Sequence, residues 1–115
     1  MTLSQDLARR LVVDVPEVEP LMQAHLADQE GELLPYLFLA DVARWAHATY
    51  ASDPTTVGRV VDWLEQEFVS AEADEKDLIG LGFVEALPFP PEGAPILLRL
   101  GPELTRVAQE IGLLS

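Results

Sequence analysis

The chain has 115 residues, and its net charge is −13 because 20 acidic residues face only 7 basic ones. With 49% hydrophobic residues it can bury one core, which excludes disorder, whereas its charge excludes direct nucleic-acid binding because phosphates would be repelled. The absence of cysteine excludes disulfides, thiolate zinc sites and thiol catalysis. No apolar run approaches the roughly 20 residues that span a bilayer, and the N-terminus lacks the apolar stretch of a signal peptide. We therefore expect one acidic domain over residues 1–115, in the cytoplasm.

The N-terminal part of the sequence predicts two helices. Thr2 and Gln5 have the spacing of a capping box, and three leucines follow at intervals of four: Leu3, Leu7 and Leu11. A second helix begins near Pro16, which is tolerated in a first turn, and Gly31 is suited to end it. Its apolar stripe consists of Val18, Leu21, Met22, His25 and Leu26.

The segment from Leu33 to Tyr50 is the predicted core helix, because it is apolar over most of its circumference. One stripe contains Leu34, Phe38, Val42 and Trp45, and beside it lie Leu33, Leu37, Ala40 and Ala43. Asp53 followed by Pro54 predicts the start of a fourth helix. Its apolar face would present Val57, Val60, Val61, Leu64 and Phe68, its opposite face Arg59, Asp62, Glu65 and Gln66, and its edge a partly exposed Trp63.

The C-terminal part predicts two further helices around a proline-rich segment. Asp74, Glu75 and Asp77 open the first, which continues through the apolar run Leu78–Leu87, where Gly80 and Gly82 would let another helix approach closely. Residues 88–95 contain four prolines and cannot form a regular helix. Residues 96–100 suit a strand or a helical turn, and we favour the turn; a final helix restarts after Gly101, with Leu104, Val107, Ala108 and Ile111 on one face. The fold class is therefore all-α, a compact bundle of five to seven short helices, with a helical-repeat-like stack as the alternative.

The residue types argue against catalysis. The two histidines, His25 and His47, have no nucleophile elbow near them in sequence, and the glycines at 80 and 82 lie in a helical pattern without the lysine of a phosphate loop. His25, Asp28 and Glu32 could share one helix face, but their spacing is not that of a known metal site, so we interpret His25 as an edge-of-core histidine. We expect no enzyme activity, no cofactor and no metal.

Two carboxylates interrupt apolar faces and must be paired or solvated. Asp41 would form an ion pair with Arg44 or Arg59 that locks neighbouring helices; alternatively, Asp41, Arg44 and the rim of Trp45 form a partner-binding hot spot. Glu85 lies on the face of Leu78, Leu81 and Gly82, and structural pairing is expected for it too.

The acidity is concentrated in two stretches. Residues 11–43 contain seven acids and no base, and residues 60–85 contain eight acids and one base, Lys76. Such stretches can be merely solvated faces, but the net charge exceeds what solubility requires and would attract a basic partner.

Three segments resemble motifs of small uncharacterised bacterial all-helical acidic proteins: Leu34–Trp45, Val61–Glu65 and Leu100–Leu104. Such proteins in turn loosely resemble the immunity proteins of bacterial toxin systems. The resemblance implies a helical fold and a bacterial origin, and it brings no established activity.

Two hypotheses on function follow. The first is an immunity-like or antitoxin-like interaction module that binds a basic partner, such as a toxin, through Asp28, Glu30, Glu32, Trp63, Glu65, Glu67, Glu72, Asp74 and Glu75. The second is a helical scaffold or regulatory domain that self-associates, for example as a homodimer, through apolar helix faces, with the acidity serving only solubility.

Overall fold

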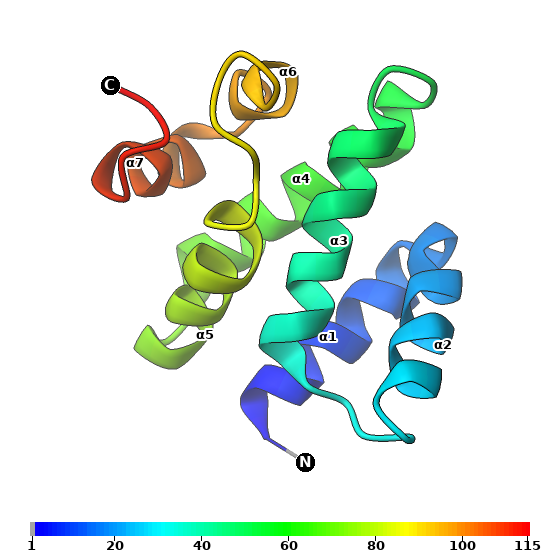
Figure 1. Ribbon diagram of the computed structural model, residues 1–115. Coiled ribbons are helices and arrows are strands. Elements are labelled where there is room, and N and C mark those ends of the chain that lie inside the picture. Colours follow the sequence, from blue (N-terminus) through cyan, green and yellow to red (C-terminus); the bar gives the residue numbers. More distant parts are fainter. Residues whose placement is uncertain (1) are drawn as a thin grey trace.

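The computed structural model describes residues 2–115, and its first elements are α1 (Leu3–Asp14), the 3₁₀ turn η1 (Pro16–Val18) and α2 (Glu19–Asp28). The capping box is confirmed, because Thr2 accepts from the Gln5 amide and the Gln5 side chain accepts from the Thr2 amide. Leu7 and Leu11 are buried as expected, but Leu3 is 60% exposed, because the first turn of α1 lies at the end of the molecule (Figure 1). The second helix ends before Gly31, which has a positive φ of 84°.

Helix α3 (Pro35–Thr49) is the central element, with α1 and α2 on one side and α5 (Ala73–Asp77) on the other (Figure 1). Its inward residues are fully buried: Phe38, Leu39, Val42, Ala43 and Ala46. The predicted core helix is thus confirmed, although Leu33 is buried just before the helix begins. Leu37, expected beside the core stripe, is exposed, because the buried face of α3 is narrower than its apolar composition suggests.

Helix α4 (Pro54–Ser70) begins where Asp53 and Pro54 predict. The Asp53 carboxylate accepts from the Thr56 amide at 3.2 Å, and hydrogen bonding to Thr56 holds the pKa of Asp53 below its usual value. Val57, Val60, Val61 and Leu64 of the apolar face are buried as expected, whereas Phe68 near its end and Trp63 at its edge are half-buried. Glu65, expected on the solvent face, is instead buried.

The predicted fifth helix is two elements. The acidic start forms α5, and the apolar run forms a π-helix, η2 (Leu78–Val84), that ends three residues earlier than expected. Leu81 is 52% exposed, so this run is not buried all round. The prediction for Gly82 is confirmed: a Cβ on it would lie 3.2 Å from the Cβ of Leu39, and α3 packs more extensively on η2 than on any other element.

The C-terminal part contains α6 (Ala94–Leu97) and α7 (Pro102–Glu110). Residues 88 and 89 are irregular and residues 90–93 form a turn, in keeping with their prolines, whereas Ala94 and Pro95 already belong to α6. The helical turn favoured for residues 96–100 is right for its first two residues only.

The all-α prediction is confirmed, with seven α-helices and no strand among residues 2–115. Contacts join elements far apart in the chain, such as α4 with α7 and α1 with α5, and one core extends from Leu7 to Leu113. A repeat stack would restrict contacts to neighbours, so the bundle describes this fold better than the stack does.

Candidate functional site

The first acidic stretch ends in an exposed turn between α2 and α3. Asp28 is the last residue of α2, Glu30 has a positive φ of 56°, and Glu32 follows Gly31; all three carboxylates are exposed. Between residues 2 and 115, no ion pair involves any of them. We call Asp28, Glu30 and Glu32 the acidic turn.

A second group of exposed carboxylates lies at the start of α5. Glu72 is the N-cap residue and Asp74 lies in the first turn, where the helix dipole favours negative charge. Both are exposed and neither has an ion-pair partner in the part of the chain that the structure describes. In Figure 1 the acidic turn lies at the lower right and α5 lies at the left, on the other side of α3.

The remaining acidic candidates of this region are occupied by Arg10. Its guanidinium pairs with Glu67 and Asp6 and lies 3.6 Å from the carboxylate of Glu75. Burial lowers the pKa of Arg10, but hydrogen bonds to Glu67 and Asp6 outweigh it and raise that pKa above its ordinary value. Glu67 and Glu75 therefore help to fasten α1 to α4 and α5.

Trp63 belongs to the same cluster. Its indole Nε1 donates to the Asp14 carboxylate at 2.7 Å, and the Arg10 guanidinium lies over its ring at 5.9 Å. The half-buried ring thus makes contacts within the molecule, between α1 and α4.

Glu65 has a structural role that its place in the sequence does not indicate. It is 9% exposed, and its two carboxylate oxygens accept from the Glu103 and Leu104 amides, each at 3.0 Å. These amides open α7, whose N-cap residue, Gly101, has no side chain to cap them. Glu65 caps α7 from α4 and is not available to a partner.

Of the two carboxylates expected to interrupt apolar faces, Asp41 has an ion-pair partner and Glu85 has none among residues 2–115. Asp41 pairs with Arg44 one turn away on the same helix, whereas the alternative partner, Arg59, pairs with Glu17 of η1. A hydrogen bond to its own backbone and the bond from Arg59 hold the pKa of Glu17 below its ordinary value. Glu85 is exposed and has no ion pair among residues 2–115, because π-helix η2 ends before it and turns its side chain to solvent.

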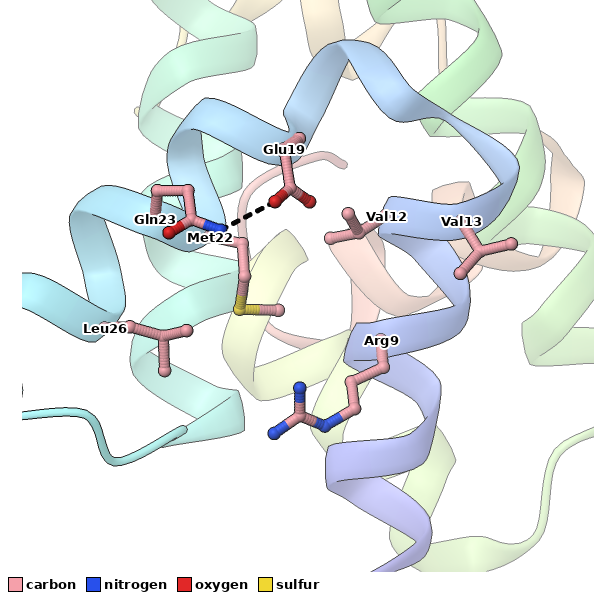
Figure 2. Close-up of a pocket in the computed structure, with 7 residues that line it drawn as sticks. All are labelled: Arg9, Val12, Val13, Glu19, Met22, Gln23 and Leu26. Carbon is pink, nitrogen blue, oxygen red and sulfur yellow. Dashed lines mark hydrogen bonds between the residues drawn. The ribbon is translucent and has the colours of Figure 1, made fainter.

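A groove of about 310 Å³ lies between α1 and α2, and the sequence did not indicate it (Figure 2). Met22 and Leu26 form its centre with Val12, and Val13 lies at its edge. Glu19 lies at one end, where its carboxylate accepts a hydrogen bond from the side-chain amide of Gln23 at 2.7 Å, and Arg9 points into the other end (Figure 2). Arg9 forms no ion pair within residues 2–115. The groove therefore has an apolar floor, a carboxylate at one end and a guanidinium at the other.

No group of three or more histidine, aspartate or glutamate side chains is placed to hold a metal within the described chain. Of the trio considered above, Asp28 and Glu32 are exposed and His25 is buried in the core, deeper than an edge position. No helix over residues 2–115 has the length and apolar character required to cross a membrane.

Comparisons with known proteins give one match. The family described as a domain of unknown function (DUF7674) matches residues 8–113, which is nearly the whole chain. No curated protein and no solved structure matches.

Proposed function

The chain belongs to the DUF7674 family, and we propose that it is a non-catalytic interaction module that binds a basic protein through the acidic turn and the start of α5. An immunity or antitoxin role toward a basic toxin is the form of this activity that we favour. Binding would block the partner's surface without any chemical step.

The observation that carries this proposal is the distribution of uncompensated charge. Five of the seven basic residues are already held in ion pairs within the molecule. Asp28, Glu30 and Glu32 stay exposed on a single turn, without such a pair among residues 2–115. Because no base of that part of the chain pairs with them, their negative charge acts on a molecule that approaches the turn.

Such a field favours a basic partner in two ways. It speeds the encounter, because attraction acts before contact, and it discriminates against acidic proteins, because like charges repel at close range. The exposed carboxylates of Glu72 and Asp74 add to the negative field, because neither forms an ion pair within residues 2–115. Four of the predicted contact residues make bonds within the fold and are weaker candidates for contact with a partner: Glu65, Glu67, Glu75 and Trp63.

The proposal is tested by capture from a lysate of the native host with three baits of the full chain. One is the wild type, and the second carries Asp28→Asn, Glu30→Gln and Glu32→Gln. The third carries Glu85→Gln, Glu92→Gln and Glu110→Gln, which removes the same charge from exposed positions elsewhere. We expect one basic protein to be retained by the first and third baits and lost from the second. Equal retention by all three baits would contradict the proposal.

Self-association is a second candidate function, and the α1–α2 groove favours it. Its charges lie at opposite ends, so a two-fold axis through its centre would place Arg9 of one protomer against the partner's Glu19 (Figure 2). Val13, which is 74% exposed beside the groove, would supply apolar contact.

Size-exclusion chromatography with light scattering measures the molar mass and so shows whether the chain is a dimer or a monomer. A dimer is expected for the wild type, a monomer for Arg9→Glu, which sets two carboxylates against each other, and a dimer again for Arg9→Glu combined with Glu19→Arg. A monomeric wild type, or a dimer that persists unchanged in both variants, would rule the groove out as the interface.

A further inference from the structure

His25, near the end of α2, is the most unusual buried polar residue of the molecule. It is 1% exposed, and its Nε2 accepts a hydrogen bond from the Leu34 amide at 3.0 Å. Leu34 is the N-cap residue of α3, and its apolar side chain supplies no capping hydrogen bond to that helix. The imidazole therefore joins the end of α2 to the start of α3 and closes the segment 29–33 between them.

The position of the imidazole proton follows from that bond. Because Nε2 accepts, it carries no proton, and a neutral ring must then hold its proton on Nδ1. Nδ1 has no hydrogen-bond partner, since the nearest charged atom, Oδ2 of Asp41, is 3.6 Å away. Phe38 contacts the ring edge-on, with 5.7 Å between the ring centroids.

The charged groups around His25 are few. Among residues 2–115, Asp41 of α3 is the one charged group within ion-pair distance of the ring, and it is shared with Arg44. Besides α3, η1 packs against α2, and its acid, Glu17, pairs with Arg59. Helix α1 borders α2 across the groove, where its charged residue is Arg9. A second proton on His25 would thus gain a counter-charge at Nδ1 from Asp41 but would find no acceptor at Nε2.

The segment that His25 closes is the acidic turn. Its backbone is already in the sparsely populated left-handed region at Glu30 and Gly31. Besides the bond to His25, its far end is held by the Gln5 side-chain amide, which donates to the Leu33 carbonyl at 3.2 Å. The near end of the turn is fixed by the backbone, because the Gln29 and Gly31 amides donate to the carbonyls of His25 and Leu26. The far end depends on the bonds to His25 and Gln5, and a proton can remove the first of them.

We propose that His25 is a pH-sensitive clasp of the acidic turn. A proton on Nε2 would oppose the Leu34 N–H with a second N–H, so the hydrogen bond breaks and the far end of the turn, residues 32–34, loosens from α2. The clasp is a property of the free chain; only its consequence, that acid weakens binding of a basic protein, rests on the proposed function. A rearranged turn would no longer present its carboxylates in one arrangement.

Amide hydrogen exchange of the full-length chain, read residue by residue by NMR, tests the clasp. We expect the protection of the Leu34 amide, corrected for the intrinsic rate, to fall at least about tenfold between about pH 7.5 and about pH 5. The Leu64 amide in α4 should stay protected, which shows that the fold persists. Unchanged protection at Leu34 would overturn the proposal.

Two variants assign the effect to one ring. In His25→Gln the side-chain oxygen can accept the same N–H without titrating, so the Leu34 amide should become insensitive to pH. His47→Gln changes an exposed histidine of α3 and should keep the wild-type response. The same fall in His25→Gln as in wild type would overturn the proposal.

The wild type also provides a test that needs no variant. The ¹⁵N shift of His25 Nε2 should change from that of an acceptor nitrogen to that of an N–H in step with the loss of Leu34 protection. Separate transitions would contradict the clasp. Because no partner is present in these measurements, their failure leaves the binding proposal standing, and a failed capture leaves the clasp standing.

Discussion

Replacing Glu65 with alanine is expected to lower the free energy of unfolding by about 3 kcal/mol, because the two amides that open α7 lose a charged, buried acceptor. Glu65→Gln should cost somewhat less, since its oxygen can still accept one bond while its NH₂ group opposes the other amide. Glu72→Ala is the matched control: it removes an exposed acid just after α4 and should change stability by no more than about 0.5 kcal/mol. Urea unfolding followed by circular dichroism measures all three.

A double-mutant cycle with Gly101 shows whether the cap itself is responsible. A Cβ on Gly101 would lie 2.6 Å from the Glu65 carboxylate, so Gly101→Ala should displace that side chain and be destabilising alone. In the Glu65→Ala background the same change should cost far less, because the obstructing side chain is gone. Strictly additive effects would contradict the assigned role of Glu65.

Replacing Gly93 with alanine is expected to destabilise the chain by about 3 kcal/mol through overpacking. Its Cβ would lie 1.8 Å from the Pro88 carbonyl oxygen, and because that atom belongs to the backbone, the turn before α6 must move as a whole. Buried Ile96 and Leu97 follow directly, so the displacement reaches the core.

Gly80→Ala makes the same chemical change at another buried glycine and serves as the control. Its nearest contact would be Val107 at 3.4 Å, which is ordinary packing, so we expect it to be neutral or stabilising by about 0.5 kcal/mol. Thermal or urea unfolding of the two variants and of wild type measures the difference in their free energies of unfolding. Equal stability of Gly93→Ala and Gly80→Ala would show that residues 88–93 are not anchored as described.

Local signals in the sequence were sufficient for most of the helix boundaries. The capping box at Thr2 and Gln5 and the cap at Asp53 depend on residues within one turn, so pattern alone predicts them. The π-helix was missed because Leu78–Val84 has a composition equally suited to an α-helix, and its winding depends on packing against α3.

The candidate site was less predictable, because its pairings join distant residues. The amides that Glu65 caps lie 38 and 39 positions later in the chain, and Arg59 reaches back 42 positions to Glu17. The period of α4 alone places Glu65 among polar neighbours. The exposure of the acidic turn followed from a local rule, since Gly31 ends the helix there. So did the pair of Asp41 with Arg44, which lie three positions apart on α3.

The central claim is that the acidic turn binds a basic partner by charge. It is tested most directly by titrating the purified captured protein with wild type and with the variant carrying Asp28→Asn, Glu30→Gln and Glu32→Gln, from about 0.03 to about 0.3 M salt, over which the Debye length shrinks about threefold. We predict that the Kd of wild type rises at least about tenfold across this range, and that the variant binds more weakly with a clearly flatter dependence. A wild-type Kd that ignores salt, or the same salt dependence in both proteins, would contradict the claim.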